Sequence, residues 1–170
     1  MESVTLFRCE LLWRKRRAFF IWASNDHDSV CLDDAGLLHL FARAEDISSF
    51  AFGQGLSLSS EPPVVYDFDS ISAWCDDPRD PIDCPRVLDA WNMLSDIHAS
   101  RGGGNDLLTH VDRRLRNAYD KLFWGCNLPA ITSEGARFDP VWSREERDSL
   151  ARLLRLGLAD LDAALSWCAP

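Results

Sequence analysis

The chain has 170 residues, of which 46% are hydrophobic and 26% charged, and its net charge is −9. This length and composition predict one domain over residues 1–170 with a substantial core, and they exclude an intrinsically disordered chain. The net negative charge argues against nucleic acid or an anionic membrane surface as a partner.

The first 66 residues are dominated by short runs that are typical of strands. Aromatic and aliphatic residues fill 5–13 and 18–23, and a basic turn over 14–17 separates them, which predicts a β-hairpin. Further strands are predicted at 29–32, 37–41 and 64–66, with a helix over about 44–52. We therefore expect a small, mostly antiparallel sheet with one helix in residues 1–66.

Residues 67–170 have the hydrophobic period of helices. A short helix is predicted over 71–75, and a longer one begins near Pro85. Apolar residues at helical spacing predict another helix from Leu108 to Phe123, and a capping box formed by Ser143 and Glu146 begins the last. The three longer helices are expected to pack on one face of the sheet, so the predicted fold class is α+β.

The cysteines indicate a reducing compartment. None belongs to a C-x-x-C pair, and we expect all six to be reduced and free of metal in a cytoplasmic protein. A zinc site built from Cys75, Cys84, His98 and His110 would match no usual ligand spacing. The six are Cys9, Cys31, Cys75, Cys84, Cys126 and Cys168.

Motifs of catalysis are missing from the sequence. It has no phosphate-binding glycine loop, no G-x-S-x-G and no H-E-x-x-H, so we expect neither an enzyme nor a bound cofactor. One enzymatic alternative stays open, because clustered carboxylates can bind Mg²⁺ or Ca²⁺. A small metal-dependent enzyme would use Asp67, Asp69 and the carboxylates of Asp76–Asp83.

The negative charge is concentrated in the middle of the chain, where residues 24–100 hold fifteen acidic and three basic residues. Between residues 67 and 83, six carboxylates accompany one arginine, Arg79, and Trp74 lies among them. An aromatic anchor beside charges that attract a basic protein is a common interface design. A solvated acidic surface with Trp74 in the core is the alternative. The predicted partner-binding set is Asp67, Asp69, Trp74, Asp76, Asp77, Asp80 and Asp83.

A family resemblance supports a binding function. The stretches NAYDKLFWGCNLP (117–129) and FDPVWS (138–143) resemble small bacterial proteins. In size, acidity and α+β composition, the chain resembles the immunity proteins of bacterial toxin systems such as contact-dependent growth inhibition. Those proteins share no motif, so no residue role is carried over. The resemblance implies a cytosolic protein that binds and neutralises a cognate, basic, nuclease-type toxin domain. Another acidic interaction module is the alternative.

Overall fold

The fold begins with a long β-hairpin. The computed structural model describes residues 4–24, 27–103 and 113–168. Strands β1 (Thr5–Trp13) and β2 (Arg16–Ser24) pair antiparallel along their whole length. The two-residue turn places Arg14 and Lys15 at φ of 52° and 58°, the left-handed region that two-residue hairpin turns require and that non-glycine residues rarely adopt. The predicted hairpin is confirmed.

The other strands extend the hairpin into a mixed sheet. β3 (Ser29–Val30) pairs antiparallel with β2, whereas β4 (Ser57–Leu58) and β5 (Val64–Asp67) both pair in parallel with β1. The strand expected at 37–41 is reduced to isolated bridges, because the Leu38 N–H donates to the Ala164 carbonyl at the end of the last helix.

The helices follow the predicted positions closely. Their bounds are Ala44–Gly53 for α1, Phe68–Asp76 for α2, Cys84–Ser100 for α3, Arg113–Gly125 for α5, Arg144–Ala164 for α6 and Ser166–Cys168 for the 3₁₀-helix η1. The capping box of Ser143 and Glu146 at the start of α6 is present. The expected start of the α5 helix at Leu108 lies outside the described residues. The predicted α+β fold, with an N-terminal sheet followed by helices, is confirmed.

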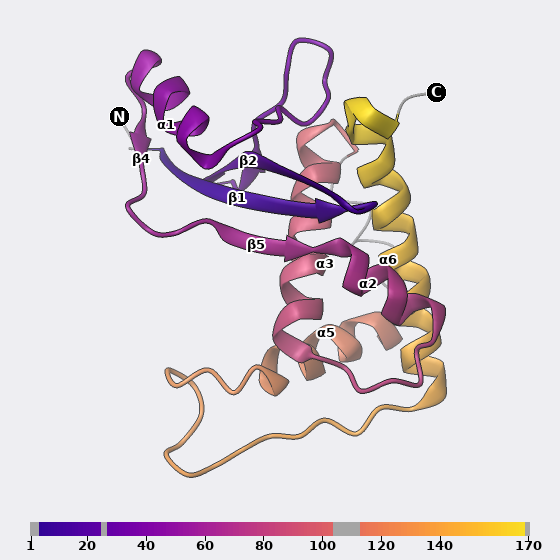
Figure 1. Ribbon diagram of the computed structural model, residues 1–170. Helices are drawn as coiled ribbons and strands as arrows, with labels where there is room; N and C mark the ends of the chain where they lie inside the picture. The colour runs from indigo at the N-terminus through magenta and orange to yellow at the C-terminus, as the bar shows by residue number, and fades with distance from the viewer. Residues whose placement is uncertain (1–3, 25–26, 104–112, 169–170) are drawn as a thin grey trace.

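The sheet separates two layers of helices (Figure 1). On one face, α2, α3 and α6 bury the larger core together with sheet residues such as Leu11 and Phe20. On the other face, α1 covers a smaller cluster around Ile47, Phe19 and Ile21. Helix α5 packs against α3 and α6 instead of the sheet. The larger core therefore joins the strand-rich and helical parts of the chain.

The ends of α3 and α6 are fastened together by a charged network. His98 on α3 lies with Nδ1 2.5 Å from Asp160 Oδ2 on α6 and with Nε2 2.8 Å from the Gly103 carbonyl oxygen. Arg101 donates to the carbonyls of Asp160 and Ala163. These contacts hold the C-terminal ends of α3 and α6 together. Among the described residues, no helix combines the length and the hydropathy needed to cross a membrane.

The hairpin turn yields a first testable prediction. The Asp69 carboxylate accepts the backbone N–H groups of Arg14 at 2.7 Å and Lys15 at 2.9 Å. Replacing Asp69 with alanine should therefore lower the free energy of unfolding in urea by about 1–2 kcal/mol. An unchanged free energy of unfolding in Asp69→Ala would show that Asp69 does not stabilise the turn.

Candidate partner-binding surface

Trp74 lies in the core. Its side chain is 9% exposed and belongs to the larger hydrophobic cluster, and its indole N–H donates to the Asp80 carbonyl at 3.2 Å. The burial of the ring agrees with the alternative interpretation of Trp74 as a core residue. The indole joins α2 to the acidic loop that follows it.

Several predicted carboxylates hold the ends of helices. Asp67 caps α2 by accepting the Ser70 N–H at 3.0 Å, and Asp83 caps α3 by accepting the Arg86 N–H at 3.2 Å. Asp69 supports the hairpin turn, as described above. An ionised cap at a helix N-terminus is favourable without any partner, because the helix dipole and free N–H groups stabilise it. These carboxylates have structural roles that charge counting alone does not reveal.

Arginines distant in sequence compensate the acidic loop between α2 and α3. Within residues 67–83 the sequence sets Arg79 alone against six carboxylates, but α6 brings Arg147 to this loop and Arg155 to the end of α2. Arg147 donates to the carbonyls of Pro78 at 3.1 Å and Asp80 at 2.8 Å. Arg155 donates to the Cys75 carbonyl and lies 3.7 Å from Asp76. The loop is therefore tied to α6.

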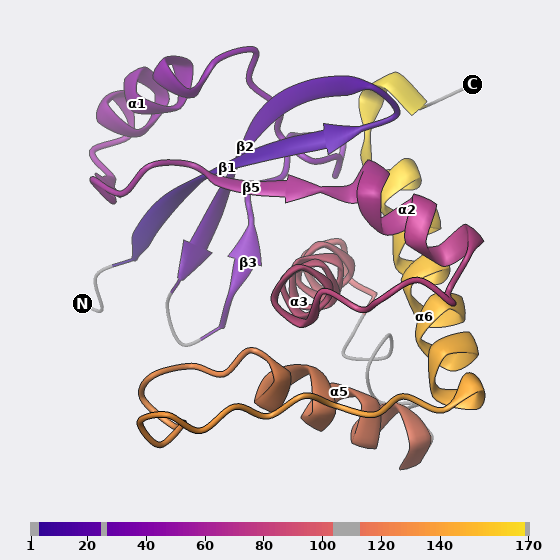
Figure 2. The same cartoon turned by 60° about the horizontal axis from the view of Figure 1, so that its bottom comes forward.

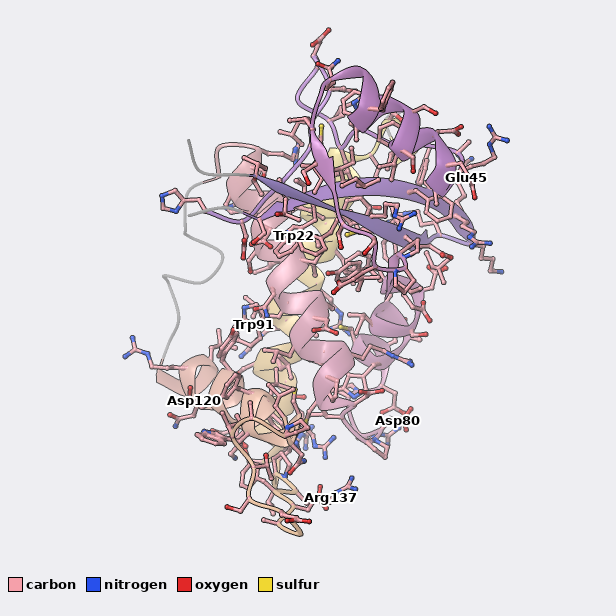
Figure 3. The ribbon with its side chains drawn as sticks, turned by 90° about the vertical axis from the view of Figure 1, so that its left-hand side faces the viewer. Trp22, Glu45, Asp80, Trp91, Asp120 and Arg137 are labelled. Atoms are coloured by element: carbon pink, nitrogen blue, oxygen red, sulfur yellow. The ribbon has the colours of Figure 1, made fainter. Side chains whose placement is uncertain are left out.

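The surface at this loop carries balanced charge. Arg79 holds Asp77 through two hydrogen bonds of 2.7 Å, which lower the pKa of that carboxyl to about 2. A cleft of about 740 Å³ here has three aspartates and three arginines in its lining, namely Asp76, Asp77, Asp148, Arg79, Arg144 and Arg147. Figure 3 shows Asp80 on this loop, in the half of the molecule away from Glu45 of α1. A cleft with equal numbers of both charges has no strong preference for a basic partner.

Unbalanced negative charge lies instead between β5 and the first turns of α3. A cleft of about 250 Å³ opens there, and we call it the β5 groove. Figure 2 shows the strand β5 and the helix α3 that border it. Its lining includes Val65, Tyr66, Asp67, Asp83, Arg86 and Asp89. Three carboxylates face one arginine in this groove, and Arg86 lies 3.7 Å from Asp83. The groove therefore carries a net negative charge.

In the β5 groove, burial and a neighbouring negative charge both disfavour the ionised form of Asp89. Partial desolvation raises the pKa of Asp89, and the negative charge of Asp83 raises it further. Burial raises the pKa of Tyr66 at the groove wall, and negative charge at Asp89 contributes. A cation placed in the groove would relieve this repulsion and favour the ionised carboxylates. The groove is thus suited to a lysine or arginine side chain.

Two aspartates should affect the pH dependence of stability in opposite directions. The pKa of Asp89 in the folded protein lies above its unfolded value of about 3.9, so Asp89 destabilises the fold as pH rises through that interval. Asp89→Asn should therefore gain free energy of unfolding, relative to the natural protein, between about pH 3 and pH 7.

Asp77→Asn is the matched comparison. The folded pKa of Asp77 is about 2, so its stabilising contribution is present above the unfolded value and is lost as pH falls towards 2. This variant should lose stability at neutral pH and approach the natural protein in acid. Urea unfolding of both variants across this pH range is the measurement, and shifts in the same direction would contradict these electrostatic assignments.

A second exposed surface is formed by the long irregular segment between α5 and α6. It presents large apolar side chains at Leu128, Ile131, Phe138 and Val141. Asn127 fixes the segment, because its amide group donates to the carbonyls of Gly125 and Phe138 and accepts the Phe138 N–H. This surface has no charge pattern that selects a partner.

The most deeply buried cysteine thiols are protonated, and the described residues form no metal-binding group. Burial raises the pKa of Cys9 to about 12 and those of Cys75 and Cys84 to about 11, so these thiols are protonated at neutral pH. Within residues 4–24, 27–103 and 113–168, no group of three or more metal-binding side chains is assembled. His110 of the zinc alternative, and the side chain of Cys168, lie outside the described residues.

Comparison of the chain with protein-family models, with curated proteins and with solved structures gave no match. The candidate site therefore rests on the geometry of this chain. Sequence reasoning placed Asp67 and Asp83 in the binding set, and the structure brings both to the β5 groove. The acidic segment expected to face the partner ended at Asp89, but the named binding set left out Asp89 and Tyr66. For Tyr66 the available signal was the Pro62-Pro63 pair before a short strand, a mark of a sheet edge.

Proposed function

We propose that this protein is an inhibitor that binds a cognate basic protein domain, of the nuclease-type toxin class, and neutralises it. The observation that carries the proposal is the β5 groove, where Asp67, Asp83 and Asp89 face a single arginine, Arg86. The groove lies within the acidic segment 24–100, so the surrounding field attracts the same partner. Asp83 and Asp89 are the groups we expect to meet its cations.

The physical arguments favour a basic protein over other partners. Phosphate groups of nucleic acids and anionic lipids would be repelled by this part of the chain. A small-molecule substrate would require reactive groups that converge on a pocket, and the carboxylates proposed for a metal-dependent enzyme are divided between helix caps, a turn and ion pairs. The toxin class is supported by the resemblance in size, acidity and α+β composition to bacterial immunity proteins.

Coexpression with candidate toxin domains tests the proposal. The candidates are basic C-terminal domains of large secreted proteins encoded beside this chain. We expect one of them to copurify as a stoichiometric complex, and its nuclease activity to fall in proportion to added protein until one equivalent is reached. An acidic protein of unrelated fold is the control and should leave the activity unchanged.

Two results would contradict the proposal. If no basic domain binds, the partner chemistry is wrong. If a domain binds and keeps full activity in the complex, the protein is a binding module of another kind and not an inhibitor. A complex that persists unchanged from low salt to about 1 M would exclude the electrostatic origin of the recognition.

A further inference from the structure

Strand β5 forms an open edge of the sheet beside the β5 groove. It pairs with β1 in parallel, from Cys9↔Val64 to Leu12↔Asp67, and no other described strand pairs with it. In an edge strand, alternate residues direct their N–H and C=O groups away from the sheet, where another strand can pair with them. Pro62 and Pro63 precede β5, so the usable edge begins at Val64.

The side chains of this edge are apolar and accessible. Val64 is 41% exposed and Val65 is 55% exposed. Successive side chains of a strand point to opposite faces, so the edge offers one valine on each face of the sheet. Natural edge strands are commonly protected by lysine, proline or a bulge, whereas β5 itself contains none of these. An added strand would cover both valines and satisfy the outward backbone groups.

The charges beside the edge determine what can occupy it. Asp83 and Asp89 lie in the groove that borders β5, together with Asp67 at the end of the strand. A second copy of this chain, paired edge to edge, would bring two such acidic groups towards each other at an energetic cost. A segment that carries lysine or arginine would instead place opposite charges beside them.

We infer that the partner contributes an extended, basic segment that adds to β5 as a new strand and directs its cationic side chains to Asp83 and Asp89. The inference rests on the proposed function, because the same basic partner supplies the segment. Backbone pairing along β5 would give this contact its direction and register, while the valines and the carboxylates would select the side chains. The added strand would extend the sheet of Figure 2 beyond β5.

Peptides test strand addition separately from the identity of the partner. The probe is a capped peptide of eight residues in which lysine and valine alternate, added to the isotope-labelled full chain. One comparison peptide replaces lysine with glutamate. The other keeps lysine and valine but carries N-methyl groups on alternate residues, which removes the N–H groups of one edge without changing the charge.

We expect the lysine–valine peptide to slow hydrogen exchange of the outward amides in residues 64–67. Both comparison peptides should bind at least about tenfold more weakly, which corresponds to about 1.4 kcal/mol. Equal binding of the N-methylated peptide would overturn strand addition and leave the basic-partner proposal intact. Equal binding of the glutamate peptide would overturn the basic character of the segment. Protection of the same amides when the protein alone is concentrated would assign the edge to a second copy and overturn the inference.

Discussion

Replacing Trp74 with alanine should lower the free energy of unfolding by about 3–5 kcal/mol, because it removes a large buried ring. The indole packs in the larger core and also donates to the Asp80 carbonyl, so the change leaves a cavity and removes one of the two donors to that carbonyl, the other being Arg147. We expect a single cooperative transition at lower urea concentration. Equilibrium unfolding followed by tryptophan fluorescence and circular dichroism is the measurement.

Trp124→Ala is the matched control, because it removes the same side chain from a site that is 49% exposed. Its cost should be well below that of Trp74→Ala, since less apolar area returns to water. If Trp74→Ala unfolds like the natural protein and instead speeds dissociation of a bound partner, the indole is an interface anchor after all. That outcome would return Trp74 to the partner-binding set expected from its sequence context.

Replacing Gly157 with valine should separate α6 from α3 and lower the free energy of unfolding by about 2–3 kcal/mol. A Cβ atom at Gly157 would lie 2.9 Å from Leu94 Cδ1 and 3.0 Å from Leu94 Cβ, both in the larger core. Figure 1 shows α3 and α6 side by side, and their close approach at Gly157 depends on the missing side chain. The gain in helix propensity over glycine, below about 1 kcal/mol, is too small to offset the clash.

Leu156→Val is the control for introducing a branched residue into α6. Leu156 neighbours Gly157 in the chain but is 64% exposed, so its replacement should cost only about 0.5 kcal/mol. Thermal and urea unfolding of both variants measure the difference. Equal stability of the two variants would mean that α3 and α6 can move apart at Gly157 without loss, which contradicts the packing described above.

Local sequence signals predicted the elements of the fold well. Thr5–Trp13 was expected as a strand and is β1, and the capping box at Ser143 begins α6. Pairing between distant segments was harder to foresee. β4 and β5 pair in parallel with β1 only because the chain crosses over before each of them. Leu38 does not join a strand ladder, because its N–H donates to the Ala164 carbonyl at the end of α6. Tertiary contacts determine these pairings, so no local sequence pattern predicts them.

The candidate site could be predicted only in part, because it also depends on tertiary contacts. Charge composition located the acidic segment, but it could not show that Arg147 and Arg155 would reach the loop from α6. Nor could it show which aspartates cap helices. The carboxylates that remain effective for binding are those that folding gathers beside β5, and Asp89 enters this group only through the approach of α3 to the strand.

Association kinetics with the basic domain that copurifies test the central claim most directly. Two triple variants neutralise three charges each, and asparagine keeps the helix-capping oxygen of Asp67 and Asp83. The groove variant changes Asp67, Asp83 and Asp89, whereas the loop variant changes Asp76, Asp77 and Asp80. Unfolding curves establish that both remain folded. We predict that the groove variant associates about tenfold more slowly at low salt and depends less on salt, while the loop variant stays within about twofold of the natural protein. A loop variant that slows association as much as the groove variant, or more, would contradict the assignment of the partner to the β5 groove.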